Sequence, residues 1–489
     1  MVGILSFGAY APRLRLQRSA IVAAHAWYNP GLRALGRGER AMASWDEDSL
    51  TMAVEAARDC LGERDRHEVR RVVFASTSAP FADRQNAGVM KEALNLDDHV
   101  AALDVGGSQR AGTSALIDAL LVAQGSGETV LCVASEQRAT APASELELLT
   151  GDAAASFLLG AGETAADLIA THSVTVDFVD HFRASGRDLD YNWEQRWVRD
   201  EGFAKIAPAA ISAALAKAEL KAEDVSRFIM AAPLRGVNAA VAKAVGIKAE
   251  AVADTLESVL GEAGCAHPLL MLAHELETAP AGAVFMVVGF GQGCDVLLLR
   301  ATGRKRAAGQ LGVSGWLARR RAEDNYCKYL AFRGTLPLER GMRAEQDAKT
   351  ALTALYRNRK AVLALVGGRC KTTGVVQFPK TPVSVAQDVR AVATQDDYPL
   401  ADRLAHVLTY TADRLGYSPD PPTYYGAVAF EGGGRITVEF ADVDEADVEV
   451  GRAMRMMFRI KAVDEARGFV KYFWKAVPDY RAATRMQAA

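Results

Sequence analysis

Short apolar runs alternate with longer alanine-rich stretches from the N-terminus to about Thr302. Val2 to Phe7 and Arg71 to Thr77 have the length and apolar content of buried strands. Ser49 to Leu61 and Gly112 to Gln124 have the length and apolar spacing of helices. The alternation predicts an α/β domain in which helices cover the sheets.

The order of predicted strands occurs twice along this part of the chain. The corresponding segments are Phe228 to Ala232 with Val73 to Thr77, Gly282 to Gly289 with Thr129 to Ser135, and Asp295 to Arg300 with Ala154 to Leu159. A repeat of this kind predicts two similar α/β halves in tandem, which we assign to residues 1–165 and 166–302.

The pattern changes after Thr302. Basic runs such as Arg304-Lys305-Arg306 and Arg319-Arg320-Arg321 stand among few strand-like segments, and they predict a linker over residues 303–347 with a solvated surface. From residue 348 a helical stretch leads into short β-branched runs separated by turns such as Gly432-Gly433-Gly434. Short strands with turn signals predict a small β-barrel within residues 348–489.

Composition excludes several classes of function. The 489 residues are half hydrophobic and carry a formal net charge of -3, which gives no bias toward nucleic acid. The longest apolar stretches are much shorter than the roughly 20 residues that cross a bilayer, and no basic leader precedes Arg13, so we expect a cytoplasmic protein without membrane contact. The six cysteines are scattered and imply no disulfide framework.

Several segments of the first 300 residues or so follow one another in an order known from one family. They are Gly3-Ile4 to Gly8-Ala9-Tyr10, Asp46-Glu47-Asp48 before a helix, Arg110-Ala111-Gly112-Thr113, and ELELLTGDAAASFLLG from Glu145 to Gly160. In this order the chain resembles hydroxymethylglutaryl-CoA synthase of the thiolase superfamily. The resemblance implies the thiolase fold and a CoA thioester as substrate.

The C-terminal part carries a second resemblance. Its motifs include Gly368-Arg369-Cys370, Phe378-Pro379, Phe430 to Arg435 and Tyr472 to Lys475, and they are similar to an acyl-CoA-associated family with a zinc ribbon and an OB fold. A ribbon binds zinc through four thiolate or imidazole ligands in paired spacing. Here Thr373 follows Cys370 at the second position and no cysteine occurs after 370, so we do not expect bound zinc.

The positions at which the thiolase superfamily keeps its catalytic groups carry other residues. The resemblance implies a cysteine nucleophile, a histidine and a glutamate, and it aligns Gln109, Ala231 and Thr77 with these three positions. An amide forms no thioester, and Ser108 beside it needs a neighbouring base before it attacks. The usual acyl-enzyme chemistry is therefore not expected.

Other residues near these positions are candidates for chemistry. The resemblance places Gly261 to Pro268 at a turn beside the nucleophile, where Glu262 and His267 form a candidate acid/base pair and Cys265 is a candidate nucleophile. A Gly-rich turn with a solvated Glu, a small buried Cys and a capping His is an equally good interpretation. Cys294 follows another Gly-rich turn and is either a packed thiol or a reactive one.

Binding of CoA requires basic groups for its phosphates. The resemblance places Lys205 and Arg235 near such positions, and Arg199 lies close in sequence. The alternative is that these side chains are only solvated.

The sequence is consistent with three functions. The first is an enzyme that makes or breaks a carbon–carbon bond beside a CoA thioester by aldol or retro-aldol chemistry, which needs a base and an oxyanion site but no acyl-enzyme. The second is a silent acyl-CoA-binding or scaffolding subunit, and the third is an acyltransferase with a relocated nucleophile. We expect a homodimer or a heteromer with a thiolase-like subunit.

Overall fold

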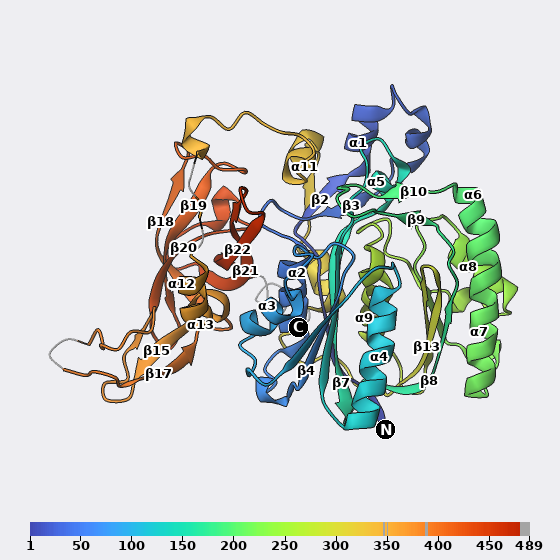
Figure 1. The fold of residues 1–489 in the computed structure, drawn as a ribbon, viewed down its shortest axis with the longest axis horizontal. Helices are drawn as coiled ribbons and strands as arrows, with labels where there is room; N and C mark the ends of the chain where they lie inside the picture. The colour runs from blue at the N-terminus through green and yellow to red at the C-terminus, as the bar shows by residue number, and fades with distance from the viewer. Residues whose placement is uncertain (346–347, 350, 387–389, 480–489) are drawn as a thin grey trace. The chain divides into compact units, whose positions relative to one another are not determined.

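The computed structural model describes residues 1–345, 348–349, 351–386 and 390–479, and it divides into two compact units (Figure 1). The first unit comprises Met1–Ser44, Asp48–Gly88 and Asp97–Tyr329. The second comprises Trp45–Glu47, Val89–Leu96 and the described residues from Leu330 onward. The first unit therefore includes residues 303–329 of the predicted linker.

A nine-stranded mixed sheet forms the centre of the first unit. Its strands lie in the order β11 (Arg227–Met230), β12 (Val284–Phe290), β13 (Gly293–Ala301), β8 (Ala166–Thr175), β1 (Val2–Tyr10), β7 (Asp152–Ala161), β6 (Val130–Gln137), β4 (Arg71–Ala75) and β5 (Ala101–Val105). Strands β4 and β6 are parallel, and β7 and β1 follow them antiparallel. The same relations hold for β11, β12, β13 and β8, which confirms the predicted pair of similar halves.

Long helices cover the sheet of the first unit. They are α2 (Ser49–Leu61), α4 (Ala111–Ser126), α7 (Ala204–Ala218) and α9 (His267–Leu276). All 13 residues of α2 are buried, and Asp48 caps its N-terminus in a capping box with Thr51. Helix α4 packs on strands of both halves, namely β6 and β7 of the first and β12 and β13 of the second.

A long arm connects β8 to α7. It contains the short hairpin of β9 (His181–Phe182) and β10 (Tyr191–Asn192), the turn α6 (Gln195–Trp197) and a π-helical turn over Val198–Phe203. Figure 1 shows that β9, β10 and α6 run along one end of the first unit. Phe203 and Phe290 stack with ring centroids 4.0 Å apart, so the arm packs onto the end of β12.

Residues 303–329 add smaller elements to the first unit. These are α10 (Gly312–Ala318), β14 (Arg321–Glu323) and the start of α11 (Tyr326–Phe332). Strand β14 lies parallel to β2 (Leu14–Gln17), which pairs with β3 (Glu39–Met42). The second of the two basic runs therefore leads into a strand.

The second unit contains a five-stranded antiparallel sheet. Its order is β20 (Arg435–Glu439), β19 (Thr423–Phe430), β18 (Ala405–Asp413), β21 (Ala453–Asp464) and β22 (Phe469–Pro478). Phe440, directly after β20, forms a bridge with Ala476 of β22, so the first and last strands meet. Met454, Phe458 and Trp474 are buried in its core. The predicted small β-barrel is confirmed.

A separate three-stranded sheet contains Cys370 at the end of β15 (Val366–Cys370), between β16 (Val376–Gln377) and β17 (Gln395–Pro399). The thiol lies 3.1 Å from the hydroxyl of Thr394. Within the described residues, no cluster of three or more His, Cys, Asp or Glu side chains could hold a metal ion. None of the described helices is both long and apolar enough to span a membrane.

Candidate active site

Three neighbouring cavities in the first unit define the candidate site. The first, which we call the apolar cavity, has a volume of about 200 Å³. Its wall is formed mainly by apolar side chains from the arm, from the end of β12 and from the loops near it. These are Leu146, Trp193, Val198, Phe203, Ala231, Pro233, Leu234, Pro268 and Phe290. The groups in this wall that can transfer protons or carry charge are Arg138, Glu145, Asp180, His181 and Glu262, and the amide of Gln109 lies beside them.

The second cavity, which we call the polar cavity, has a volume of about 600 Å³. It shares Gln109, Asp180 and His181 with the apolar cavity, so the two cavities adjoin at these residues. Most of its remaining lining side chains are polar: Ser76, Thr77, Asn86, Asp104, Ser108, Arg183, Asp190 and Gln292.

The third cavity, which we call the basic cavity, has a volume of about 370 Å³. Arg18, Arg37 and Arg235 contribute to its lining, together with the carboxylates of Glu145, Asp254 and Glu257. It shares part of its wall with the apolar cavity, namely Glu145, Gln195, Pro233 and Leu234. A ligand with an anionic end could therefore extend from the basic cavity into the apolar one.

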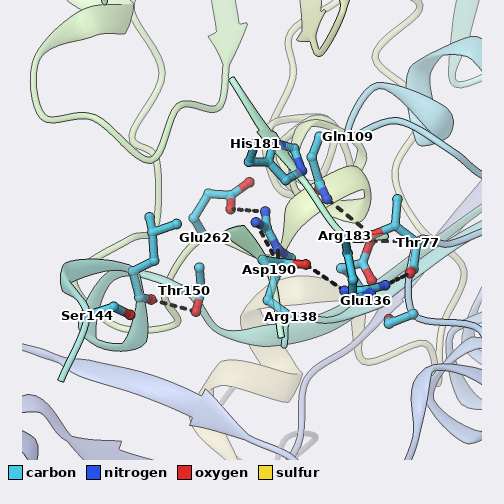
Figure 2. A network of polar contacts seen from close by, with 12 residues as sticks. Thr77, Gln109, Glu136, Arg138, Ser144, Thr150, His181, Arg183, Asp190 and Glu262 are labelled. Atoms are coloured by element: carbon cyan, nitrogen blue, oxygen red, sulfur yellow. Dashed lines mark hydrogen bonds and ion pairs between the residues drawn. The ribbon is translucent and has the colours of Figure 1, made fainter. Parts of the chain in front are cut away.

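Gln109 and Thr77 form one hydrogen-bonded group with the buried carboxylate of Glu136 (Figure 2). The amide of Gln109 donates to the Thr77 hydroxyl at 3.1 Å, and that hydroxyl donates to Glu136 at 2.8 Å. Within the described residues, the Oε1 atoms of Gln109 and Glu136 have no hydrogen-bond partner. Ala231, the third of these positions, lines the apolar cavity.

Glu262 is held in the wall of the apolar cavity by its own backbone. Its N–H donates to the Leu149 carbonyl at 2.7 Å, and its carbonyl accepts from the Gly151 N–H at 2.9 Å. Gly261 before it has φ +82°, and a Cβ there would lie 2.4 Å from the Thr150 carbonyl oxygen. Only glycine fits this approach, so the turn fixes where the Glu262 side chain begins.

The Glu262 carboxylate belongs to a buried chain of charges (Figure 2). One oxygen lies 3.8 Å from the Arg138 guanidinium, which also pairs with Asp190 at 3.0 Å. Asp190 in turn pairs with Arg183 at 2.6 Å. Burial alone would lower the pKa of Arg138, but the carboxylates of Asp190, Glu262 and Glu136 raise it above its usual value.

His267 does not join Glu262 in the cavity. Its Nδ1 atom accepts from the Ala263 N–H at 3.0 Å, and its Nε2 atom lies 2.7 Å from the Thr255 carbonyl oxygen. A carbonyl only accepts, so Nε2 carries the proton and both ring nitrogens are used by the backbone. The His267 ring thus holds the turn, as in the capping interpretation, and of the candidate acid/base pair only Glu262 lines the apolar cavity.

The candidate nucleophiles are engaged or buried. The Ser108 hydroxyl donates to the Gly291 carbonyl at 2.8 Å, although the residue lines the polar cavity. Burial raises the pKa of the Cys294 thiol to about 12. Burial and the carboxylate of Glu136 raise the pKa of Cys265 well above its usual value. Neither cysteine lines the three cavities.

The residues expected to bind CoA lie in different surroundings. Lys205 pairs with Glu201 and Arg199 pairs with Asp200, in both cases on the surface. Only Arg235 lines the basic cavity. No sequence motif indicated Arg18 and Arg37, which lie in the N-terminal region, far along the chain from the predicted positions.

The arm supplies a histidine that no sequence motif indicated. The Nδ1 atom of His181 lies 3.1 Å from a carboxylate oxygen of Asp180, and no described residue forms a hydrogen bond with its Nε2 atom. Glu136 was missed as well, although it stands at the end of a predicted strand next to the strand that ends at Thr77. That adjacency is the signal that could have found it, since β4 and β6 pair in parallel.

Comparisons with known proteins agree with this architecture. Residues 215–298 match the family model of the 3-oxoacyl-[acyl-carrier-protein] synthase III C-terminal domain, and residues 399–459 match that of the ChsH2 C-terminal OB-fold domain. Hydroxymethylglutaryl-CoA synthase from Methanobrevibacter smithii is 28% identical over 306 residues, which cover 60% of this chain and 86% of the relative. The enzyme of that name from Caldivirga maquilingensis is 29% identical over 300 residues, which cover 60% and 85%.

Solved structures show the same fold. A hydroxymethylglutaryl-CoA synthase complexed with CoA matches with a TM-score of 0.60 and 16% identity over 72% of this chain and 94% of that chain. The 3-oxoacyl-[acyl-carrier-protein] synthase III from Aquifex aeolicus matches with a TM-score of 0.54 and 19% identity over 61% of this chain and 100% of that chain. The chain therefore combines a thiolase-like α/β body, similar in sequence to hydroxymethylglutaryl-CoA synthase, with a C-terminal OB-fold domain similar to that of ChsH2.

Proposed function

We propose that the first unit makes or breaks a carbon–carbon bond beside the carbonyl of a CoA thioester, by aldol or retro-aldol chemistry without a cysteine acyl-enzyme. The observation that carries the proposal is Glu262. It is a carboxylate in a largely apolar cavity, and its Oε2 atom, which lies 3.8 Å from the Arg138 guanidinium, has no hydrogen-bond partner among the described residues. A carboxylate in such surroundings can take a proton from carbon.

The cavities suggest how a CoA thioester would bind. The phosphates would lie in the basic cavity against Arg18, Arg37 and Arg235. The pantetheine chain would pass the walls that the basic and apolar cavities share, and the thioester would reach the apolar cavity. The similarity to hydroxymethylglutaryl-CoA synthase, including one solved with CoA, supports this class of ligand.

The charges around Glu262 suit the formation of an enolate. Glu262 would take a proton from the carbon next to the thioester carbonyl, and the negative charge would move to the carbonyl oxygen. The Arg138 guanidinium lines the same cavity and would stabilise that charge. A Claisen route through an acyl-enzyme is disfavoured because Cys265 and Cys294 are buried thiols with raised pKa values.

Deuterium exchange tests the proposal directly. The protein is incubated in D₂O with acetyl-CoA or propanoyl-CoA, and deuterium at the carbon beside the carbonyl is measured by mass spectrometry. We expect catalysed exchange, and we expect Glu262→Gln to slow it by about 10²-fold or more while CoA binding changes little. Glu163→Gln serves as a matched control, because the Glu163 side chain is 90% exposed on the surface.

Other outcomes would favour the other two functions. CoA binding without any exchange would favour the silent acyl-CoA-binding subunit. A covalent adduct in the intact mass after incubation with acyl-CoA would favour an acyltransferase that uses Ser108, Cys265 or Cys294. Unchanged exchange in the Glu262→Gln variant would contradict the role given to this carboxylate.

A further inference from the structure

The polar cavity of the candidate site is lined by a different set of side chains from the apolar cavity. We infer that the polar cavity takes the second reactant of the proposed reaction, a small uncharged carbonyl compound that carries hydroxyl groups, and that His181 exchanges a proton with its carbonyl oxygen. The inference rests on the proposed function and gives the same site its second substrate class and a second catalytic residue.

The position of His181 is the first argument. It lines both cavities, whereas Glu262 and Arg138 line only the apolar one. In an aldol reaction the new bond joins a carbon on one side to a carbonyl on the other. A group that serves the carbonyl oxygen must stand where the two reactants meet, and the two cavities adjoin at His181, Gln109 and Asp180.

The state of the His181 ring is the second argument. A carboxylate oxygen of Asp180 lies 3.1 Å from Nδ1 and also accepts the backbone N–H of His181 at 2.9 Å. The carboxylate only accepts, so its contact with Nδ1 favours the tautomer that carries the proton on Nδ1 and leaves the lone pair on Nε2. Since no described residue partners Nε2, that atom is free to take or give a proton.

The charges in the polar cavity are the third argument. The lining includes the carboxylates of Asp104, Asp180 and Asp190 but only one arginine, Arg183. Asp190 already pairs with Arg183. The Asp104 carboxylate accepts backbone N–H groups of Asn86 and Ala87 at 2.8 and 2.7 Å. An anionic reactant would meet an excess of negative charge, whereas an uncharged hydroxylated one would find many hydrogen-bonding groups.

The remaining polar groups provide those hydrogen bonds. Hydroxyl or amide side chains line the cavity at Ser76, Thr77, Asn86, Gln109 and Gln292. Leaving such groups without partners against a hydrocarbon reactant costs free energy, so the cavity selects against apolar aldehydes.

The reaction balances with these two proton carriers. Glu262 takes a proton from the carbon beside the thioester carbonyl, and that carbon bonds to the carbonyl carbon of the second reactant. The carbonyl oxygen takes a proton from Nε2 of the His181 imidazolium, which gives a 3-hydroxyacyl-CoA. Water returns the proton from Glu262 to His181. The cleavage reaction follows the same steps in reverse, and neither direction requires an oxidant or a reductant.

Two separate readouts test the inference. The full-length protein is given propanoyl-CoA with glycolaldehyde, glyoxylate or hexanal, and the 3-hydroxyacyl-CoA product is measured by mass spectrometry. Deuterium exchange into propanoyl-CoA is measured without any aldehyde. We expect glycolaldehyde to react at least about tenfold faster than the other two, because the site's polar groups stay paired and no like charge is buried.

Variants separate the two steps. We expect His181→Gln to slow bond formation by about 10²-fold or more and to slow deuterium exchange much less, because Glu262 alone carries the proton in exchange. Ala79→Leu adds volume to the wall of the polar cavity and leaves the apolar cavity untouched. We expect it to raise the KM for glycolaldehyde.

The outcomes distinguish the inference from the proposed function. If the protein exchanges deuterium but prefers hexanal or glyoxylate, or if His181→Gln forms product at the normal rate, the inference is wrong and the proposed function stands. If no exchange occurs with any acyl-CoA, the proposed function fails and the inference fails with it.

Discussion

Arg138 is the residue at which the charged groups of the candidate site meet. Its guanidinium is buried, lies 3.0 Å from Asp190 and 3.8 Å from Glu262, and its pKa is raised by their carboxylates despite its burial. A buried charge is tolerated only with such partners, because an unpaired one loses its hydration without compensation. The positive charge of Arg138 thereby stabilises the ionised Glu262 carboxylate in the largely apolar wall of the cavity. The proposed chemistry requires this ionised form as the base.

The ionisation of the Cys370 thiol should make the stability of the protein depend on pH. Hydrogen bonds from Thr373 and then Thr394 lower the pKa of its thiol from 9.0 to about 6. A lowered pKa means that folding favours the thiolate, so this contribution to the free energy of unfolding is fully present above pH 9 and is lost as the pH falls through about 6. We expect Thr394→Val to raise the pKa of Cys370 toward 9.

Thiolate absorbance at 240 nm measures this titration in a Cys327→Ser background. The buried thiols of Cys60, Cys132 and Cys294 have pKa values raised to about 12, so they do not titrate in the same range. Cys370→Ser is the control that should remove the transition near pH 6. A midpoint near pH 9 with Thr394 intact would contradict the prediction.

Sequence reasoning could identify site residues only where a motif anchored them. Gln109 stands beside Arg110-Ala111-Gly112-Thr113 and Glu262 stands in a Gly-rich turn, so both could be found. His181 could not, because it lies in an arm that matches no motif. The hydrogen bonds of the His267 ring could not be predicted either, because its bonds to the backbone of Ala263 and Thr255 depend on how the turn folds.

At the scale of elements, the site depends on how closely α4 approaches the turn after Glu262. A Cβ on Gly112, in the first turn of α4, would lie 2.1 Å from the Cys265 carbonyl oxygen. That contact is with backbone, so it cannot be relieved by a rotamer change. The helix and the turn are therefore held at a distance that only glycine permits.

Gly112→Ala should lower the free energy of unfolding by about 1–3 kcal/mol, because the turn must move to admit the methyl group. We also expect slower deuterium exchange, since the turn positions Glu262. Gly125→Ala in the same helix is the matched control: nothing lies within 4 Å of its added Cβ, and alanine favours the helix by about 0.5–1 kcal/mol. Urea unfolding of both variants checks the difference, and equal stabilities would refute it.

The elements with strong periodicity were predictable, and the arm was not. The helix expected at Ser49 to Leu61 is α2 with the same bounds, and the strand expected from Val2 extends to Tyr10. The arm has strands of only two residues and exposes Trp193 and Tyr191, so its sequence has neither a strand period nor a buried stripe. Its conformation is determined by packing such as that of Phe203 on Phe290.

At the scale of the whole molecule, the repeat of strands could be predicted because each half has the same order of apolar runs. What the sequence did not reveal is that the halves join in one sheet through β1 and β8. A Cβ on Gly3 would lie 2.1 Å from the Ala166 carbonyl oxygen, so glycine allows this junction. The sequence also did not predict that the first unit continues to Tyr329, because this depends on the pairing of β14 with β2.

The free edge of the nine-stranded sheet predicts self-association. Strand β5 is the last strand in the order, and in the part of the chain that the structure describes only β4 pairs with it. The Leu103 side chain in this strand is 50% exposed. An exposed apolar edge strand is an aggregation hazard unless another strand covers it. A second copy of the chain, with its β5 antiparallel to the first about a two-fold axis, would cover it without leaving a new edge.

We therefore expect light scattering to give a particle of twice the 52.4 kDa chain mass at micromolar concentration. Leu103→Lys should shift it toward the monomer, because each two-fold related edge would then bring a charge close to its counterpart. Leu121→Lys is the control, since Leu121 is 49% exposed but lies on α4 rather than on the sheet edge. If the unchanged protein is monomeric, the homodimer is excluded and the same edge becomes the place to seek a thiolase-like partner subunit. If Leu103→Lys and Leu121→Lys behave alike, association does not use β5.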